Sequence, residues 1–543
     1  MNRRIIIAAL APLPLLMGAQ TAYDAYQISR YDLRGTARFM SMGGAFGALG
    51  GDLSVLGQNP GGIGVYRKSD IGITLDIDSR SISSPDDSRN RTNVSVSNLG
   101  YVGSVYTGSE IMPIFNWGFS YGRTNSFKRR YNGSATMQGS LSNHIAAFTD
   151  GCSSDLLGGA TSDDVVDNYM QGGGAPWLSI LAFNSYVINP TNGDANTPST
   201  MYTGLWKEGT SRGISSYNVD ESGYVDEYNI NFGGNFSDIV YWGIGFGITD
   251  MEYRQNVYYT EDMTGGYITT SEGSGVTETS GNFGFGLNSY KRISGSGFNF
   301  KAGLIFRPIN ELRLGFAVHT PTYYNLSQSS IAEIDYGYGY TGEGEPVPGY
   351  ANTPQDDYDW KLRTPWRLMV SAAGVIGSQA IISMDYEYRP YQKMVTKNDN
   401  GDNQTGINND IENYYKAANI IRLGAEYRLP AGFSLRAGYA YESTPTAATP
   451  RANSADSYMP DWTMNPGDTG TIPSYTMDNS AQYITCGLGY RYQGFYADFA
   501  YVHKARNSTF SAFTPSGETG ATPYDAKLKQ ADNSFVLSLG IKF

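Results

Sequence analysis

The sequence predicts an all-β fold, a 14-stranded antiparallel transmembrane β-barrel with an N-terminal hatch (plug) inside its lumen. Three observations support this prediction. Segments that alternate apolar and polar residues recur from residue 70 to the end, which is typical of strands with one apolar face. The links between them alternate between short turns and long polar loops. A glycine-rich segment precedes the first strand and is available to fill the barrel.

The composition suits a barrel better than a helical or nucleic-acid-binding protein. The 543 residues include 43 tyrosines and 66 glycines, and only 17% are charged. Because the formal net charge is −12 and no Lys/Arg cluster opposes it, we expect no nucleic-acid partner. The length would allow several domains of ordinary size. A large β-barrel exceeds that size as a single domain, and we therefore expect one principal domain.

Residues 1–19 have the layout of a secretory signal peptide. Basic Arg3 and Arg4 precede an apolar run that is too short, and too interrupted by proline, to span a bilayer as a helix. After residue 19 no stretch approaches the roughly 18 unbroken apolar residues of a transmembrane helix. We therefore expect the exported chain to cross a membrane only as strands.

Residues 20–69 are the predicted hatch, centred on the glycine-rich stretch from Tyr31 to Tyr66. Apolar residues recur in it at a spacing of three and four, which predicts one face of a short helix. These residues are Phe39, Met42, Phe46 and Leu49. Arg34, Arg38 and Asp52 lie off that face, where they can pair with charges of a barrel wall. A linker is the alternative interpretation, but the helical spacing and the lack of a Ser/Pro bias favour a hatch.

Residues 70–543 are the predicted barrel with long extracellular loops. Its first strand shows the repeating pattern, with Ile71, Ile73 and Leu75 on one face and Thr74 and Asp76 on the other. Fourteen segments share this pattern: 70–80, 93–106, 114–131, 222–235, 239–259, 295–308, 311–337, 357–374, 379–390, 418–428, 432–443, 480–492, 495–506 and 533–543. An even strand number is typical of outer-membrane barrels.

The links sort by length in a regular way. Short turns are predicted near 235–238, 308–310, 377–379, 429–432 and 493–494. Long polar loops are predicted at 81–92, 132–221, 260–294, 338–356, 391–417, 444–479 and 507–532. Short turns at one rim and long loops at the other indicate an outer-membrane barrel rather than a soluble sandwich.

The two faces of the strands are expected to be inverted relative to a soluble barrel. The apolar bands are about nine to eleven residues long, which is enough for a tilted strand to cross hydrocarbon. Aromatic residues fall toward strand ends, where interfacial girdles lie. Rows such as Phe535, Leu537 and Leu539 should therefore face lipid, and charged residues should line the lumen. Because fourteen strands enclose more space than their own side chains fill, the lumen needs a plug or stays open.

Three stretches of the sequence carry a resemblance to a known family. They are RGTARFMSMGGAFGALGGDLSVLGQNPGGIGVY at Arg34 to Tyr66, HTPTYYNL at His319 to Leu326, and the terminal FVLSLGIKF. In these the chain resembles the FadL/TodX-type outer-membrane transporters of long-chain fatty acids and hydrocarbons, in the version found in Bacteroidetes. The resemblance runs across the chain after the signal peptide and implies fourteen strands with an N-terminal hatch. The family's Asn-Pro-Ala motif stands here as Asn59-Pro60-Gly61, a mild departure.

The resemblance implies a function in the cell outer membrane. Members of the family capture an apolar molecule among extracellular loops, pass it to a lumenal pocket and release it after the hatch shifts, often sideways into the bilayer. We accordingly expect passive uptake of a hydrophobic small molecule such as a fatty acid, by a monomer among outer-membrane lipids that needs the barrel-assembly machinery for insertion. The alternative is a FadL-like barrel that serves as a secretion or surface-lipid-handling partner, since fold does not settle function.

Two groups of residues are candidates for binding such a ligand. Within an apolar run of the longest loop, Trp177, Leu178, Leu181 and Phe183 are candidates for the ligand's tail, because an exposed apolar patch usually marks a binding surface. The alternative is that this run packs on the barrel mouth and closes it.

A carboxylate head group would need a cation. Arg367, Arg422 and Arg436 of the wall are the candidates. Each of them can instead pair with a carboxylate, for example Glu426, Asp385 or Asp52 of the hatch. The sequence leaves this choice open.

No pattern for catalysis, a metal or a cofactor stands out. The three histidines, His144, His319 and His503, are scattered, no Cys/His cluster has zinc spacing, and no Ser/His/Asp order is evident. Loop 398–406 carries oxygen ligands for calcium but lacks the closing Glu of an EF-hand, which favours a solvated loop. We expect no enzyme activity, cofactor or metal, and a haem-binding histidine stays an open alternative.

Overall fold

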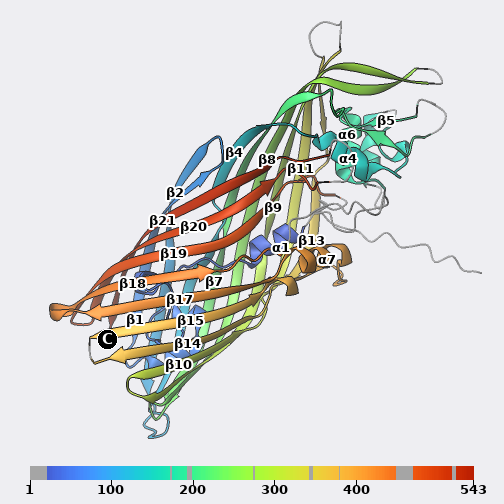
Figure 1. Ribbon diagram of the computed structural model, residues 1–543. Helices are drawn as coiled ribbons and strands as arrows, with labels where there is room; N and C mark the ends of the chain where they lie inside the picture. Colours follow the sequence, from blue (N-terminus) through green and yellow to red (C-terminus); the bar gives the residue numbers. More distant parts are fainter. Residues whose placement is uncertain are drawn as a thin grey trace, which may run out of the picture.

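The structure is a computed structural model that describes residues 21–159, 161–170, 174–192, 198–272, 275–340, 347–377, 379–447, 469–515 and 521–543. The predicted signal peptide, residues 1–19, lies outside the described residues. From Asp70 onward the chain forms one closed antiparallel barrel (Figure 1). Among the described helices, none has the length and apolar character that a membrane-spanning helix requires.

The barrel wall has fourteen strand positions, and pairing of the first with the last closes it. In order they are β1 (Asp70–Ser83), β2 (Ser88–Tyr106), β3 (Ile114–Ser126) with β4 (Arg129–Thr136), β7 (Arg212–Phe236), β8 (Val240–Glu272), β9 (Gly275–Ile309), β10 (Leu312–His319) with β11 (Tyr323–Tyr340), β13 (Asp356–Arg363) with β14 (Arg367–Ile376), β15 (Ala380–Pro390) with β16 (Val395–Asn398), β17 (Ala417–Arg428), β18 (Phe433–Glu442), β19 (Tyr475–Tyr492), β20 (Phe495–Ser511) and β21 (Asp525–Lys542). β12 (Val347–Asn352) pairs with the outer end of β11. The predicted fourteen strands are confirmed.

The predicted inversion of the strand faces is also confirmed. Phe535, Leu537 and Leu539 are 45%, 41% and 49% exposed on the outside of the barrel, whereas Val536 and Ser538 between them are buried. Alternation of this kind recurs on every strand position, with charged and polar side chains on the inner face. The outside is therefore an apolar, lipid-facing belt.

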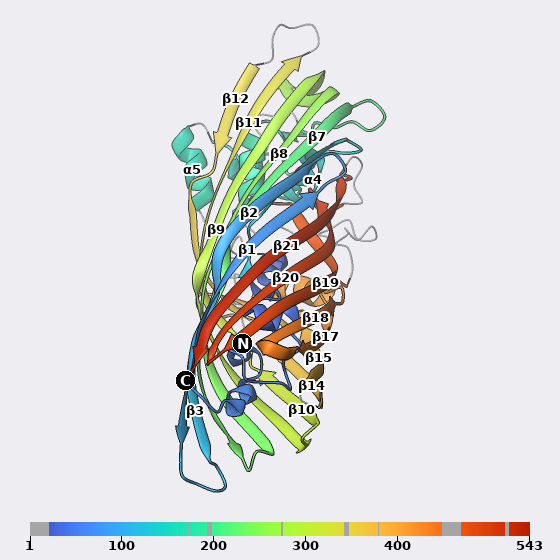
Figure 2. The same ribbon diagram turned by 90° about the vertical axis from the view of Figure 1, so that its left-hand side faces the viewer.

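The strands at the long-loop rim extend further than the sequence predicts. Residues 260–294, expected to be a loop, continue β8 and β9 to Glu272 and Gly275, and β7 begins at Arg212 within the expected loop 132–221. In this extension the outer face is polar and apolar residues such as Phe283, Phe285 and Leu287 point inward, so the alternation is the reverse of that in a lipid-facing strand. Backbone pairing continues there. Figure 2 shows β7, β8, β9, β11 and β12 rising above the rest of the wall.

Two strand positions predicted as continuous are broken at prolines. β10 and β11 are separated at Thr320, Pro321 and Thr322, and β13 and β14 at the segment around Pro365. Proline has no N–H for the strand ladder, so the ladder stops there. The two breaks lie side by side, because the Thr322 N–H donates to Thr364 Oγ1 at 2.8 Å.

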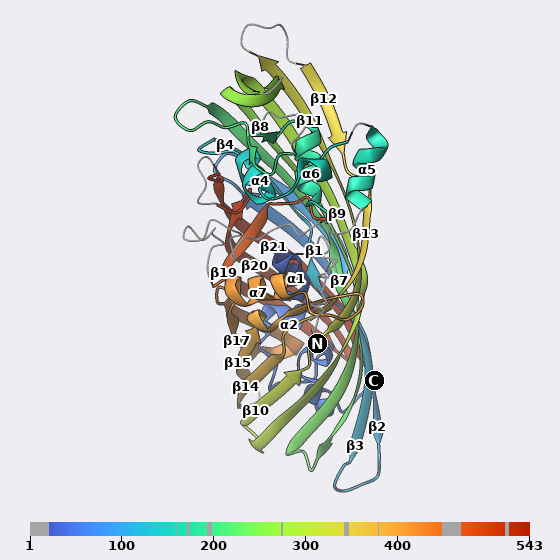
Figure 3. The same cartoon turned by 90° about the vertical axis from the view of Figure 1, so that its right-hand side faces the viewer.

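The N-terminal segment, residues 21–69, lies inside the barrel (Figures 2 and 3). It contains α1 (Ala22–Ser29), α2 (Ala37–Ser41), α3 (Val55–Gln58) and the 3-10 turn η1 (Pro60–Val65). The predicted helix through Phe39 and Leu49 is shorter than expected. α2 ends at Ser41 because Gly43 and Gly44 take positive φ angles of 62° and 74°, which a helix does not accommodate.

Helices of the longest loop close the long-loop rim. They are α4 (Leu141–Thr149), η2 (Ser154–Leu156), α5 (Ser162–Met170) and α6 (Trp177–Asn184), with a short ribbon of β5 (Asn189–Pro190) and β6 (Tyr202–Thr203). We call residues 141–206 the cap. Their apolar side chains share one buried cluster with inward residues of β7, β8, β9 and β11. Elsewhere α7 (Thr405–Tyr414) and η3 (Tyr391–Lys393) pack near α1, and η4 (Pro430–Gly432) forms a short turn.

Glycines allow the N-terminal segment to lie directly on the backbone of the wall. A Cβ added to Gly61 would stand 2.8 Å from the carbonyl carbon of Gly303 on β9, and one added to Gly303 would overlap Asn59 Oδ1. Asn59 holds this contact, since its Oδ1 accepts from Gly61 N–H at 3.0 Å. Glycine rather than alanine at position 61 is thus required by the wall behind it.

Gly303→Ala should loosen this contact. The added methyl group overlaps Asn59, and overpacking of this kind costs about 1–3 kcal/mol of unfolding free energy. The thermal unfolding midpoint in detergent should fall. Gly374→Ala on β14 is the control, because nothing lies within 4 Å of the added methyl group there. Equal midpoints for the two variants would contradict the close contact.

Candidate functional site

Five charged residues of the N-terminal segment pair with opposite charges on the inner wall. The pairs are Asp24 with Lys291 at 2.6 Å, Arg30 with Asp478 at 2.7 Å, Asp32 with Lys504 at 2.6 Å, Arg34 with Asp76 at 2.9 Å and with Asp78, and Arg38 with Glu426 at 2.8 Å. All of these side chains are nearly buried. Breaking one such pair leaves an uncompensated charge, so the pairs fix where the segment sits.

The sequence singled out Arg34 and Arg38, and both contact the wall. Asp52 does not, contrary to expectation: its carboxylate accepts from the Thr36 hydroxyl at 2.7 Å and from the Ser54 N–H at 2.9 Å within the segment itself. Sequence reasoning missed Asp24, Arg30 and Asp32. Two of their partners, Lys291 and Asp478, lie in stretches expected to be loops, so the wall charges that match them could not be placed.

Glu426 accepts hydrogen bonds from three arginines. It accepts from Arg38 Nε at 2.8 Å, from Arg436 Nε at 2.8 Å and from Arg428 Nε at 3.3 Å. Arg436 also donates to Asp498 at 2.6 Å. Of the three arginines proposed for a carboxylate ligand, Arg436 therefore has two carboxylate partners already.

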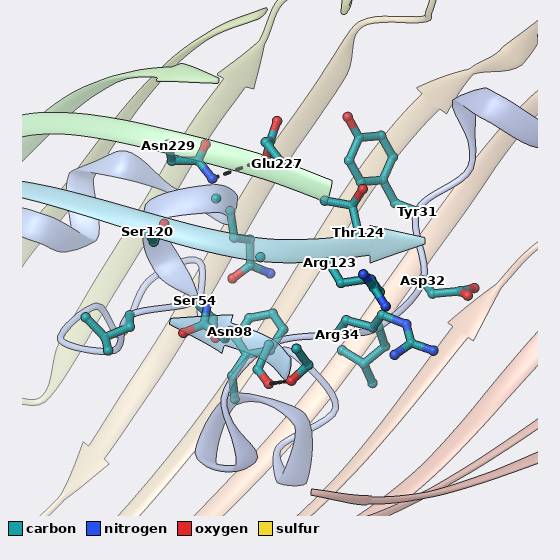
Figure 4. A pocket seen from close by; sticks show the side chains of 18 of the residues that line it. Tyr31, Asp32, Arg34, Ser54, Asn98, Ser120, Arg123, Thr124, Glu227 and Asn229 are labelled. Carbon is teal, nitrogen blue, oxygen red and sulfur yellow. Dashed lines mark hydrogen bonds between the residues drawn. The ribbon is translucent and has the colours of Figure 1, made fainter. Parts of the chain in front are cut away.

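A cavity lies between the N-terminal segment and the wall. It holds about 670 Å³ of space, part of it open to solvent. Most of the residues that line it are polar or charged, and Figure 4 shows side chains of both the segment and the wall gathered around it: Tyr31, Asp32, Arg34, Ser54, Asn98, Ser120, Arg123, Thr124, Glu227 and Asn229. Leu33, Phe39 and Leu53 are its apolar part.

Three arginines on one side of the cavity share a single carboxylate. Glu387, which is fully buried, accepts from Arg367 at 2.7 Å, Arg389 at 2.6 Å and Arg422 at 2.7 Å. The ring of Tyr31 lies against the guanidinium groups of Arg367 and Arg389. Nη1 of Arg422 is buried and has no hydrogen-bond partner. This side of the cavity therefore has an excess of cationic donors, and Arg389 is a member that sequence reasoning missed.

The cavity lies where two wall strands separate. Pairing of β2 with β3 runs from Tyr106 only to Asn98, opposite Gly122, and both of these residues line the cavity. Beyond that point, in a fully described stretch, β2 pairs with β1 alone and β4 with β7 alone. We call this unpaired boundary the seam. Side chains bridge it: Arg91 donates to Asp220 at 2.8 Å, and Lys128 contacts Asn93.

The tail-binding candidates of α6 are packed rather than exposed. Trp177, Leu178 and Leu181 are buried in the core of the cap, and Phe183 packs against it. The expected exposed patch is therefore wrong, because α6 turns its apolar side chains toward α4, β11 and β12, as in the alternative that the run closes the barrel mouth. Their role in binding a tail stays a prediction.

His144 of α4 lies in the cap, outside the lipid-facing belt. It stacks on Phe513 at 5.2 Å and meets Phe148 edge-on, and burial lowers its pKa to about 4. His319 is buried in the lumen, where Nε2 contacts the Gln58 carbonyl at 2.7 Å. Among the described residues no group of three His, Cys, Asp or Glu is arranged to hold a metal ion. The 398–406 loop is instead closed by its own hydrogen bonds between Asn398 and Asp402.

The barrel of fourteen strand positions, the buried N-terminal segment and the capped long-loop rim define the fold class: a closed transmembrane β-barrel of the FadL/TodX fold type. Among solved structures, a Pseudomonas aeruginosa FadL homologue matches with a TM-score of 0.52 and 12% identity, over 95% of this chain and 100% of that one. This match carries the assignment of the fold, and it confirms the fold implied by the resemblance.

Two further structures match with lower TM-scores. The Pseudomonas putida toluene transporter TodX gives 0.45 at 11% identity, over 95% of this chain and 100% of that one. The Ralstonia pickettii toluene transporter TbuX gives 0.44 at 14% identity, over 94% and 99%. No protein-family model matches the sequence, and no curated protein matches it significantly. The Bacteroidetes version of the family stays a prediction.

Glu426→Gln should release the end of the N-terminal segment near α2. Arg38 would lose the charge that compensates it, Arg436 would keep only Asp498, and breaking a buried pair in this way costs about 3–5 kcal/mol. We expect faster cleavage of residues 30–60 by protease in detergent, with the barrel still folded. Glu412→Gln is the control, since the Lys393–Glu412 pair is more than 60% exposed and should contribute almost nothing. Identical cleavage rates would contradict a holding role for Glu426.

The cap should loosen in acid. Burial holds the pKa of His144 at about 4 against an ordinary value of 6.5, so docking is fully supported above pH 6.5 and weakens as pH falls from 6.5 toward 4. The loss is at most about 3 kcal/mol. Fluorescence of Trp177 and Trp206 in the cap would report it. His144→Phe should remove this part of the pH dependence, whereas His503→Gln on β20 should retain it. A change of equal size in both variants would contradict the assignment to His144.

Proposed function

We propose that this protein is an outer-membrane channel for passive uptake of amphiphiles that carry an apolar tail and a carboxylate head, such as long-chain fatty acids. The observation that carries the proposal is the cavity at the foot of the seam, with excess cationic donors on one side. A neutral hydrocarbon has no acceptor for these N–H donors, whereas a carboxylate accepts hydrogen bonds from them.

The arginines that share Glu387 are proposed to receive the head group. Arg422 has a buried donor atom without a partner and lines the cavity together with Arg367 and Arg389. A carboxylate bound there would satisfy that donor and offset the excess positive charge, and hydrogen bonds to charged groups are worth about 1.5–3 kcal/mol each. Arg436, a candidate from the sequence, is less suited because Glu426 and Asp498 already neutralise it.

The tail is proposed to leave through the seam. Leu33, Phe39 and Leu53 give the cavity only a small apolar surface, too little to bury a long alkyl chain. Outside the seam, Val94 and Leu99 on β2 are exposed toward lipid, at 66% and 41%. A ligand with its head in the cavity and its tail between β2 and β4 satisfies both ends, and it accounts for a polar cavity in a channel for apolar cargo.

Entry requires the cap to move, and passage inward requires the N-terminal segment to act as a hatch. Trp177, Leu178, Leu181 and Phe183 of α6 would contact the tail once α6 is displaced. The pairs of Arg34 and Arg38 with wall carboxylates would hold the hatch reversibly. Both roles are part of the proposal, and neither needs an energy source within this chain.

Arg422→Gln tests the head-group role. In cells that lack other fatty-acid channels, uptake of radiolabelled oleate should fall about tenfold, because one charged hydrogen bond is lost. Uptake of a neutral alcohol of equal chain length should not change. Lys393→Gln, an exposed lysine paired with Glu412, is the charge-matched control.

Two results would count against this function. Unchanged oleate uptake in Arg422→Gln would remove the head-group site. Copurification of a stable protein partner, with no amphiphile detected by mass spectrometry after gentle extraction, would favour the alternative role in secretion or surface-lipid handling.

A further inference from the structure

A second cavity opens on the outer face of the wall, at the outer end of the seam. It lies over β4, β7 and β8, beside the turn between β1 and β2, and holds about 840 Å³ of space, much of it open to solvent. We propose that this cavity binds a neutral oligosaccharide built of hexopyranose rings. The inference uses only the outside of the wall, so it is independent of the proposed uptake function.

The floor of the cavity is a grid of polar side chains from three neighbouring strands. Direct partners in the strand register form two rows, with Asn132, Asn218 and Tyr258 in one and Ser134, Ser216 and Thr260 in the other. Because neighbouring strands lie about 4.8 Å apart, a row across three strands spans about 10 Å, which suits two linked pyranose rings. The amide and hydroxyl groups both donate and accept hydrogen bonds, as the hydroxyl groups of a sugar require.

Tyr258 supplies an aromatic platform at the end of the first row. A Cβ added to Gly286 of β9 would stand 2.7 Å from the Tyr258 hydroxyl and 3.0 Å from two of its ring carbons. The ring therefore lies across the glycine, close to the sheet, and it is 41% exposed. A pyranose ring has apolar C–H faces and hydroxyl edges, so it can pack on the Tyr258 ring while its hydroxyl groups reach the polar grid.

Charged groups around the cavity oppose an acidic ligand. Carboxylates outnumber arginines there: Asp86, Asp87, Asp220 and Asp262 surround the floor together with Arg89, Arg91 and Arg130. Arg89 pairs with Asp87 at 2.8 Å, and Arg91 and Arg130 both pair with Asp220. The floor itself is uncharged, and Asp86, held by the Ser134 N–H at 3.2 Å, is placed to accept from a neutral hydroxyl group.

The cavity lies well outside the lipid-facing belt. On β7 the exposed apolar row ends at Tyr228, and Asn218 stands ten residues further along the strand. Ten residues of strand cover about 33 Å, or about 25 Å of height for a strand tilted by roughly 40°. The head groups of membrane lipids extend only about 5–7 Å beyond the hydrocarbon. The ligand is therefore a free oligosaccharide or the outer part of a surface polysaccharide, and not the head group of a lipid.

The test uses the intact barrel in a detergent without a sugar head group, titrated in a calorimeter with cellotetraose, mannotetraose and the acidic tetragalacturonate. The wild-type protein should bind at least one neutral tetrasaccharide, at least tenfold more tightly than tetragalacturonate. Tyr258→Ala should weaken this binding at least tenfold, and Asn218→Ala several-fold. A soluble glucan or mannan of the preferred sugar distinguishes the two sources: its binding would assign the site to a surface polysaccharide, and its exclusion to a free oligosaccharide.

Tyr350→Ala is the matched control, because the Tyr350 ring is 57% exposed on β12, outside this cavity. It should bind the sugar as the wild type does, and heat-modified gel migration would show that all variants are folded. Equal affinity of Tyr258→Ala and the wild type would overturn the site. Equal affinity of the wild type for tetragalacturonate would overturn the assignment to a neutral sugar, and failure to bind either neutral tetrasaccharide would overturn the proposal as a whole.

Discussion

The close contact between two backbones is the constraint on which the rest of this structure depends. A fourteen-stranded barrel encloses a space that its own side chains do not fill, and the N-terminal segment fills it only by lying directly on the wall. Glycines on both sides make this possible: Gly61 rests on Gly303, and Gly64 on Gly234. A methyl group at these places would separate the segment from the wall. The lumen would then open, and the cavity at the seam would lose one of its two walls.

Glycine contacts determine how closely the N-terminal segment approaches the barrel wall, and ion pairs determine its position along that wall. Apolar contacts tolerate sliding, whereas Arg34 between Asp76 and Asp78, or Arg38 on Glu426, fits at one place only. Buried ion pairs add little net stability, because desolvation offsets most of the attraction. The ion pairs therefore position the segment, while its apolar side chains, such as Tyr26 and Phe46, supply the packing against the wall. If the segment moves as the proposed function requires, these pairs would return it to the same place.

Strand number, strand faces and the placement of Arg34 and Arg38 could be derived from the sequence, because lipid on one side and charge on the other impose a strict alternation. The same reasoning does not predict the strands where they extend beyond the lipid-facing belt. Residues 260–294 continue β8 and β9 with polar residues outward and Phe283, Phe285 and Leu287 inward, the reverse of a lipid-facing strand, and Lys291 was missed as the partner of Asp24. The breaks at Pro321 and Pro365 interrupt a pattern that remains regular on both sides. The predicted pairing of Asp52 with the wall is wrong for another reason. Thr36 and Ser54 are nearer partners than the wall, and their nearness follows from the folded backbone of the segment, which the sequence does not show.

In the proposed uptake function, the polar lumen would decide which cargo the barrel accepts. An apolar molecule gains nothing from Arg422 or from the other guanidinium groups around Glu387, and displacing water from them would cost free energy. An anionic amphiphile gains at both ends, provided that its tail is not drawn through the lumen. The unpaired boundary between β2 and β4 would be that route in the proposed function, because the tail then exchanges one hydrocarbon surrounding for another while the head alone meets charge. In the proposed function, selection by head group and passage along the wall would both follow from one arrangement, the cavity placed where the ladder between β2 and β3 ends.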